Sequence, residues 1–186
     1  MFVCPIDDHL ALRLFSVLDA DEAADVVVRN RERLARWLPW ATPDVDAASE
    51  RAFISGSLAR WSRGESCESW LTYDGAIIGA AGLCVIRPDE QWAEIGYWVD
   101  AAYEGRGFVT RAVRVLERIA FEDLRCGRVQ ICCDADNVRS AGVPERLGYT
   151  LEGTLRRHRV SGSPPRVADH RVYGLLRSEW QAREAS

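Results

Sequence analysis

The sequence predicts a single α+β domain over residues 1–186, built on a mixed, mostly antiparallel sheet with flanking helices. Short apolar runs of strand length outnumber the helical segments, and two of these runs meet at Asp74-Gly75, a strong hairpin signal. The length and the hydrophobic fraction of 47% allow one core to form without disulfides. Strands that follow one another through tight turns favour antiparallel pairing, hence the predicted sheet.

The N-terminal part is expected to hold one strand followed by two helices. Residues 9–15 alternate between apolar and polar side chains, as a half-buried strand does. Asp19 followed by Glu22 is typical of a helix cap with a carboxylate at the third position, so a helix should run from there toward Trp37. Prolines interrupt this helix, and a second one is expected over residues 46–63.

A long helix and a short one are expected among the remaining strands. The strands are predicted over residues 67–73, 76–87, 92–99, 128–134, 149–155 and 167–176. The long helix should start near Gly107, because apolar residues then recur at helical spacing through Leu124. The short helix contains residues 140–147, and the Ser-Gly-Ser-Pro-Pro segment at 161–165 should form the turn between the last two strands.

The loop between strand 92–99 and the long helix carries two glycines, in the segment Glu104-Gly-Arg-Gly-Phe-Val-Thr110. A strand, a glycine loop and a helix N-terminus direct unpaired N–H groups and the positive end of the helix dipole at one point, which favours a pyrophosphate. The nucleotide-triphosphatase loop requires a lysine, and this chain contains none. The dinucleotide fingerprint requires a third glycine where Thr110 stands, so both well-known phosphate loops are excluded.

The loop resembles the pyrophosphate loop of the Gcn5-related N-acetyltransferases, the GNAT superfamily. Their motif is Gln/Arg-x-x-Gly-x-Gly/Ala, and alignment on Gly107 makes Glu104 and Val109 depart from its outer positions. The segments Asn137-Val-Arg-Ser140 and Pro144-Glu-Arg-Leu-Gly-Tyr149 resemble the branch that modifies ribosomal-protein N-termini, the RimJ/RimL type. Three more segments resemble that branch in the same order, at residues 37–40, 153–156 and 169–180. The resemblance therefore covers nearly the whole chain.

The resemblance implies the GNAT fold, in which the strands carrying Tyr97 and Ile131 run parallel and splay apart around acetyl-CoA. Arg106, helped by Arg111, should add local positive charge for this polyanionic co-substrate. Asn137 is expected to contact it, although a turn residue is the alternative. The residues expected to bind acetyl-CoA are Tyr97, Trp98, Val99, Gly105, Arg106, Gly107, Phe108, Val109, Thr110, Asn137 and Ser140.

Two residues are candidates for proton transfer. Glu94 shares a strand face with Trp98 and matches the strand glutamate that is the general base in the histone-acetylating branch; a structural partner for an arginine is the alternative. Ser140 matches the serine proposed to protonate the leaving thiolate in the RimL-like branch, and a helix cap is its alternative role. Other members use a tyrosine seven residues after the position of Asn137, where this chain has Pro144.

Trp37 and Trp40 flank a proline at a helix end and could line a groove for the acceptor, with a core position as the alternative. The α-amino group has a pKa of about 7.7–8.0 and the lysine side chain one of about 10.4. Deprotonating the amine at pH 7 therefore costs roughly 3.5 kcal/mol less free energy for an α-amino group than for lysine. A protein N-terminus is therefore the first expected acceptor. A small amine, such as an antibiotic or metabolite, and a catalytically silent acyl-CoA sensor remain open, as does succinyl-CoA as donor.

The bulk composition excludes several other classes of protein. The net charge of −4 argues against a nucleic-acid partner, and no apolar run reaches the length of a membrane span. The N-terminus lacks an export signal, so a cytoplasmic protein is expected. The six cysteines show no C-x-x-C spacing, which predicts reduced thiols and no metal. A homodimer or higher homo-oligomer remains open.

Overall fold

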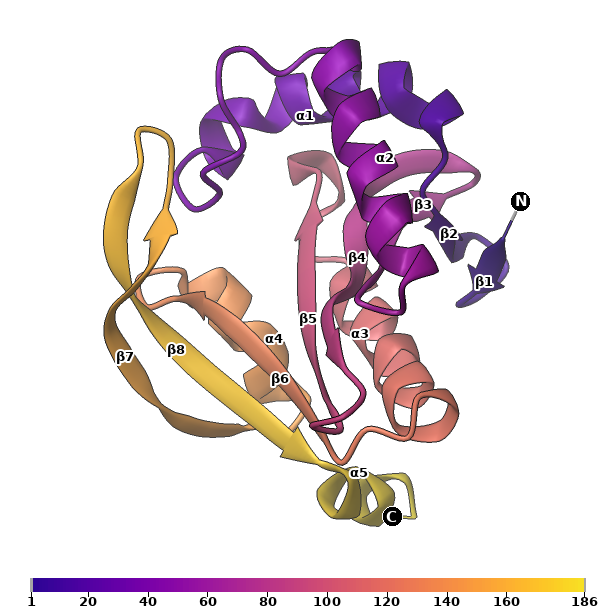
Figure 1. Ribbon diagram of the computed structural model, residues 1–186, viewed down its shortest axis with the longest axis vertical. Coiled ribbons are helices and arrows are strands. Elements are labelled where there is room, and N and C mark those ends of the chain that lie inside the picture. The colour runs from indigo at the N-terminus through magenta and orange to yellow at the C-terminus, as the bar shows by residue number, and fades with distance from the viewer. Residues whose placement is uncertain (1, 186) are drawn as a thin grey trace.

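The computed structural model describes residues 2–185, which form one eight-stranded sheet with helices on both of its faces (Figure 1). The sheet has the order β1-β2-β3-β4-β5-β6-β8-β7. Its strands are β1 (Val3–Pro5), β2 (Leu10–Leu14), β3 (Cys67–Tyr73), β4 (Ala76–Arg87), β5 (Trp92–Val99), β6 (Arg128–Asp134), β7 (Thr150–Ser161) and β8 (Arg166–Leu176). The α-helices are α1 (Ala20–Leu34), α2 (Ala47–Ser62), α3 (Phe108–Arg118), α4 (Val138–Arg146) and α5 (Arg177–Glu184). The predicted α+β class is confirmed.

The N-terminal segment differs from its prediction in two places. Strand β1 was not expected; it pairs antiparallel with β2 and forms the edge of the sheet. Asp19 is the N-cap residue of α1, as predicted, but its side chain makes no capping hydrogen bond to this helix, because its carboxylate accepts a hydrogen bond from the Ser16 N–H of the preceding 3₁₀ turn. Glu22 does not close a capping box and instead accepts a hydrogen bond from the Ile77 N–H at 2.7 Å, which ties α1 to β4.

The two predicted hairpins are present, but the second is longer than expected. At the first, Asp74 and Gly75 have φ of 49° and 84°, the left-handed backbone that a two-residue hairpin turn requires. At the second, β7 continues to Ser161 instead of ending near Leu155. The added segment is rich in arginine and mostly exposed, so it lacks the apolar alternation by which strands are recognised.

Strands β5 and β6 run parallel and separate, as the resemblance implied. Their pairing lasts for three residues, from Trp92 opposite Arg128 to Glu94 opposite Gln130. Beyond Glu94 no strand of the described chain pairs with this edge of β5, while β6 continues against β8. The separation opens the sheet between the two strands (Figure 1). The β7–β8 hairpin lies on the far side of this opening, and its turn meets the end of α1, where the Ser163 N–H donates a hydrogen bond to the Ala35 carbonyl at 2.7 Å.

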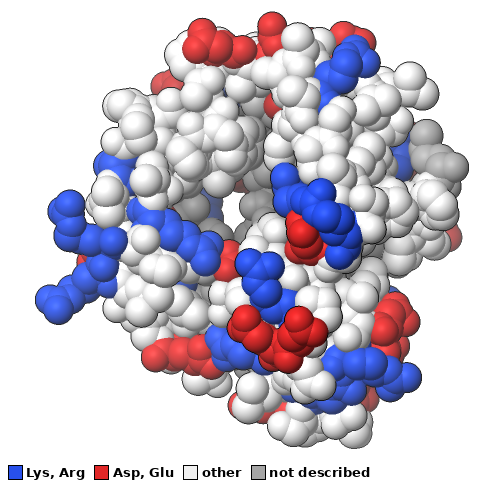
Figure 2. Space-filling model, viewed as in Figure 1, with Lys and Arg blue, Asp and Glu red and all other residues white. Residues whose placement is uncertain are grey.

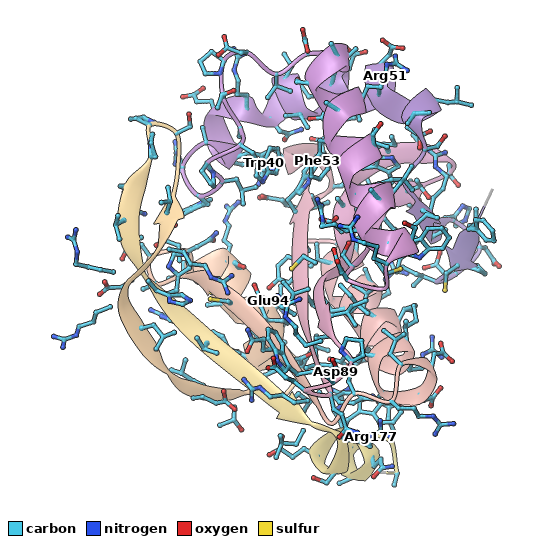
Figure 3. All side chains as sticks on the ribbon, viewed as in Figure 1. Trp40, Arg51, Phe53, Asp89, Glu94 and Arg177 are labelled. Carbon is cyan, nitrogen blue, oxygen red and sulfur yellow. The ribbon has the colours of Figure 1, made fainter. Side chains whose placement is uncertain are left out.

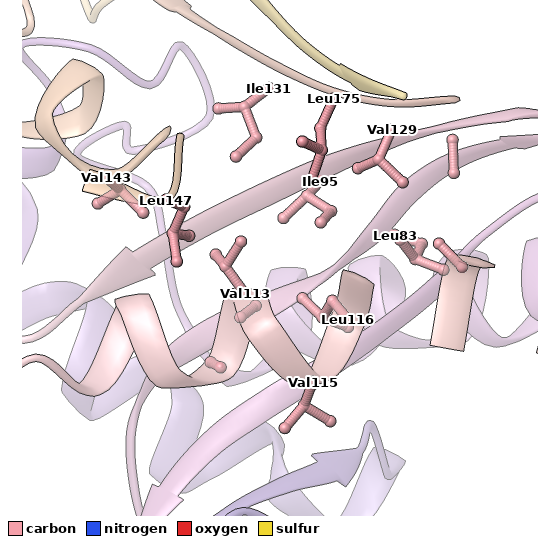
Figure 4. Close-up of a cluster of buried hydrophobic side chains, with 14 of the residues drawn as sticks. Leu83, Ile95, Val113, Val115, Leu116, Val129, Ile131, Val143, Leu147 and Leu175 are labelled. Carbon is pink, nitrogen blue, oxygen red and sulfur yellow. The ribbon is translucent and has the colours of Figure 1, made fainter. Parts of the chain in front are cut away.

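Hydrophobic clusters pack against both faces of this opened sheet. On one face, Val113 and Leu116 of α3 pack with Ile95 and Ile131, residues of the two separated strands (Figure 4). On the other face, α1 and α2 pack with β3 and β4 around Ile54 and Trp70. Helix α3 ends in a π-helical turn over Ile119–Asp123. Within residues 2–185, no helix is long and apolar enough to cross a membrane.

Candidate active site

A cleft of about 1140 Å³ lies where β5 and β6 separate. Its walls come from the end of α1, the second half of β5, the glycine loop, the end of β6 and the start of α4. Figure 2 shows the surface hollowed between the β7–β8 hairpin and the helical part of the molecule. The expected cofactor residues that line this cleft are Tyr97, Trp98, Val99, Gly105, Gly107, Phe108, Val109, Thr110, Asn137 and Ser140.

The glycine loop has the backbone conformation of an anion site. Gly105 and Gly107 both have φ of 73°, and no atom of the described chain lies within 4 Å of a Cβ built at either position. Gly107 is the N-cap of α3, so the N–H groups of the first helical residues have no intrahelical partner. The loop therefore presents open N–H donors, the positive end of a helix dipole and free space to one point.

Arginines give the cleft a positive lining, but not the ones expected. Arg106 stacks over the Tyr103 ring at 5.2 Å and does not line the cleft, and Arg111 forms an ion pair with Asp7. The arginines that do line it are Arg33, Arg36, Arg139, Arg146 and Arg159. Arg139 and Arg146 lie in the two segments around α4 that carry the family resemblance, whereas the other three are scattered along the chain, so only the fold brings all five together.

Glu104 occupies the motif position where the family has glutamine or arginine. Its carboxylate accepts a hydrogen bond from Arg33 Nη1 at 2.7 Å and forms an ion pair with Arg139 of α4. Arg33 also donates a hydrogen bond to the Val99 carbonyl at the end of β5. Glu104 thus links α1, the glycine loop and α4 across the cleft, and its charge is neutralised by two arginines.

Ser140, Tyr97 and Asn137 meet at the start of α4. The helix is capped by Asn137, whose Oδ1 accepts a hydrogen bond from the Ser140 N–H at 3.2 Å, so Ser140 itself is not the cap. The Tyr97 hydroxyl donates to the Ser140 carbonyl at 2.9 Å, and the Ser140 hydroxyl lies 3.4 Å from the Tyr97 oxygen. Burial raises the pKa of Tyr97 well above its usual range, which keeps the phenol protonated.

Glu94 lies just below the point where the strands separate, on β5 (Figure 3). Its side chain is only 6% exposed and forms a two-pronged ion pair with Arg159 of β7, with N–O distances of 2.6 and 3.0 Å. Gln130 donates a third hydrogen bond at 2.7 Å. The ion pair raises the pKa of Arg159. The alternative role foreseen for Glu94, a partner for an arginine, is therefore present in the structure.

A second cavity, of about 540 Å³, lies between α2 and the sheet. It meets the cleft at Leu38, Gly96, Tyr97 and Trp98, which line both. The two tryptophans expected in an acceptor groove are divided between them: Trp37 lines the cleft and Trp40 lines the second cavity. The Trp40 ring lies 6.2 Å from the Trp98 ring, at the junction of the two spaces.

Cysteines lie near the site without forming a disulfide or a metal centre. Cys132 and Cys133 line the cleft and Cys84 lines the second cavity. Burial raises the pKa of Cys133 to about 11, so its thiol is protonated at neutral pH. Residues 2–185 contain no group of three or more His, Cys, Asp or Glu side chains placed to hold a metal ion.

Comparisons with known proteins agree with this geometry. A family model described as "Acetyltransferase (GNAT) domain" matches residues 9–150. A Bacillus subtilis protein named "Putative ribosomal N-acetyltransferase YdaF" is 35% identical over 97% of this chain and 98% of its own. A crystal structure of a "Probable acetyltransferase" has a TM-score of 0.90 at 34% identity, covering 97% and 99% of the chains. RimL, titled "Ribosomal L7/L12 alpha-N-protein acetyltransferase in complex with Coenzyme A", shares the fold, with a TM-score of 0.88 at 22% identity over 94% and 98%.

Proposed function

The chain belongs to the GNAT family of acetyltransferases, and we propose that it transfers the acetyl group of acetyl-CoA to the α-amino group of a ribosomal-protein N-terminus. The observation that carries the proposal is the junction of the two cavities at Gly96, Tyr97 and Trp98, where a thioester from one side would meet an amine from the other. The Bacillus subtilis relative, whose name describes a ribosomal N-acetyltransferase, supports the choice of acceptor.

The residues of the cleft fit a substrate with a pyrophosphate. The loop N–H groups from Gly105 to Thr110 would hold the two phosphates, because the glycines leave room for close approach. Arg146 and Arg36 line the same cleft and would add attraction at longer range. Past Glu94, the open edge of β5 offers N–H groups that could polarise the thioester carbonyl in the manner of an oxyanion hole.

Ser140 is proposed to protonate the departing thiolate. Its hydroxyl lines the cleft at the first turn of α4, and the helix cap is provided by Asn137 instead. Tyr97 holds the Ser140 backbone in place and stays neutral, so it could in turn supply hydrogen-bonding support to the hydroxyl. Ser140 would thereby take the role of the tyrosine that this chain lacks at Pro144.

Glu94 is proposed to accept the proton of the amine through water. Its carboxylate lies on the β5 face that also carries Gly96 and Trp98, but its oxygens already accept bonds from Arg159 and Gln130. A relay through water fits this better than direct contact, because Arg159 lines the cleft and its guanidinium is half-exposed. The arginine would also hold the carboxylate in a fixed position.

The test is a screen for acetyl transfer, with peptides that carry N-terminal ribosomal-protein sequences and with small amines as acceptors. Acetyl-CoA and succinyl-CoA are compared as donors, and free CoA is measured. Turnover of peptides with acetyl-CoA supports the proposal. Turnover of small amines alone would replace it with a small-molecule acetyltransferase, an alternative that the aromatic second cavity favours. CoA binding without any turnover would indicate a sensor, in line with the departures at Glu104, Val109 and Pro144.

A further inference from the structure

The second cavity combines an aromatic wall with a buried carboxylate. The rings that line it belong to Phe15, Trp40, Phe53, Trp70, Tyr97 and Trp98. Trp40 and Phe53 lie at the same end of it, on the loop after α1 and on α2, and both are more than 40% exposed, at 42% and 45% (Figure 3). A ligand in the cavity can contact such partly exposed rings, whereas aromatic rings that are buried in the core are already covered by other side chains.

Glu50 is the unusual residue of this cavity. It lies on the buried face of α2, one turn before Ile54, and its side chain is only 7% exposed. Among residues 2–185, no hydrogen bond or ion pair reaches its carboxylate, and burial raises its pKa. The oxygens of this carboxylate are not among the fully buried unpartnered atoms, so they remain accessible from the cavity that Glu50 lines. A largely desolvated carboxylate in such a place favours a cationic partner that arrives with the ligand.

The charges around the cavity leave Glu50 uncompensated. Glu68 also lines the cavity, but it accepts a hydrogen bond from Arg60 at 2.7 Å and another from Ser57. Asp44 contributes a third carboxylate from the exposed loop. No arginine or histidine is among the described lining residues, in contrast to the arginine-lined cleft next to it. The two adjoining spaces therefore differ in charge: the cleft is lined by more arginines than carboxylates, and the described charged residues of the second cavity are carboxylates alone.

We propose that this cavity selects amine acceptors that carry a second positive charge on an apolar spacer, with Glu50 as the anion that binds that charge. The inference rests on the proposed acetyl transfer and names the chemistry of its acceptor. The amine to be acetylated lies at the junction near Gly96, the spacer packs among Trp40, Trp70 and Trp98, and the second cation reaches Glu50. The aromatic rings add cation–π attraction to the ionic contact.

The indole of Trp70 forms part of the aromatic wall of this cavity. Trp70 is 1% exposed, lines the cavity, and its Nε1 has no hydrogen-bond partner within the described chain. The ring therefore contributes apolar surface to a cavity of about 540 Å³, which is large enough for a drug-sized molecule, since such sites measure roughly 300–1,000 Å³.

The test uses two series of acceptors that differ only in the second charge. The small-molecule series is hexylamine, 1,6-diaminohexane and 6-aminohexanoate; the peptide series has Leu, Arg or Glu as first residue before one common sequence. The cationic member of at least one series should have a KM about tenfold or more below its neutral counterpart, since a hydrogen bond to a charged group is worth about 1.5–3 kcal/mol. The series in which this occurs identifies the source of the acceptor.

Glu50→Gln should remove this preference while leaving the KM of the neutral acceptor within about twofold. Glu32→Gln is the matched control, because this substitution removes the same charge from an exposed residue of α1 that lines neither cavity. Turnover without any preference for the cationic member, or a preference that survives Glu50→Gln, would overturn the inference and leave the proposed function standing.

A binding measurement separates this inference from the transfer reaction. Pentyltrimethylammonium cannot be acetylated and should quench the fluorescence of the tryptophans in the cavity, with an affinity that Glu50→Gln lowers about tenfold and Glu32→Gln does not. Quenching of this kind without turnover of any amine would support the cavity assignment and reject acetyl transfer. No Glu50-dependent quenching would contradict the cavity assignment.

Discussion

Ser140 and Asn137 lie one helical turn apart, and the structure gives them separable roles. The Asn137 carboxamide caps α4, while the Ser140 hydroxyl faces the cleft near the Tyr97 oxygen. A loss of stability and a loss of chemistry can therefore be assigned to different side chains. The sequence alone left both roles open for Ser140, because a serine near a helix start is most often a cap.

Ser140→Ala is expected to lower kcat and to leave the affinity for acetyl-CoA nearly unchanged, because only the leaving group loses its acid. Asn137→Ala should instead cost about 1 kcal/mol of unfolding free energy through the lost cap. Steady-state kinetics and thermal melts of both variants check this. A normal kcat in Ser140→Ala would remove the serine from the chemistry.

Glu94→Gln is expected to slow acetylation about 10²–10⁴-fold at pH 7, the usual span for general-base catalysis. The loss should shrink as the pH rises, because more acceptor then arrives already deprotonated. Arg159→Gln is the companion variant, since it removes the ionic partner and leaves the carboxylate in place. A loss that does not change with pH, and that is equal in both variants, would mean that Glu94 only positions Arg159.

Glu50→Gln is expected to melt at or above the temperature of the wild type at pH 8. Burial raises the pKa of Glu50 in the folded state above its unfolded value, so the carboxyl contributes stability where it is protonated and loses that contribution as the pH rises through the folded pKa. The neutral glutamine avoids this loss. The difference in melting temperature should shrink as the pH falls toward 4.5, the ordinary pKa of a glutamate. A variant less stable than wild type at pH 8 would indicate a structural role for Glu50.

At the scale of elements, the strand–loop–helix unit from β5 to α3 was predictable and the arginine-rich hairpin was not. Strands β5 and β6 have their predicted bounds, because each is an apolar run between clear turn signals. The second half of β7 is exposed and charged, so nothing in its pattern distinguishes it from a loop. Arg159, the ion-pair partner of Glu94, lies in that unrecognised half. The sequence therefore suggested an arginine partner for Glu94 as an alternative role but did not identify which arginine it is.

Gly107→Val should weaken acetyl-CoA binding at least tenfold in calorimetry, because the side chain would fill the space that a phosphate needs. Gly64→Val is the matched control. Gly64 has a similar φ of 70° and also has no atom within 4 Å of a built Cβ, but it lies after α2, outside both cavities. Both variants carry the same backbone strain. Equal affinities in two folded variants would place the pyrophosphate elsewhere.

At the scale of the molecule, the overall charge of −4 conceals a local division of charge. Arginines line the cleft, carboxylates line the second cavity, and arginines also cover the outer side of the β7–β8 hairpin (Figure 2). The family resemblance located the cleft through its glycines. It could not locate Glu50 or identify which arginines line the cleft, because a single charged residue leaves no pattern in the sequence, and its role becomes visible only when the fold assembles its neighbours.

The central claim is that acetyl-CoA in the positive cleft acylates an α-amine, and the position of the acetyl group in the product tests it most directly. A peptide with a free α-amino group and one internal lysine is incubated with the enzyme and acetyl-CoA, and the product is read by tandem mass spectrometry. The enzyme itself contains no lysine, so none of its side-chain amines competes. We predict acetylation of the α-amine alone, because the lysine costs roughly 3.5 kcal/mol more to deprotonate at pH 7. Acetylation of the lysine, or of neither amine while CoA binds, would contradict the claim.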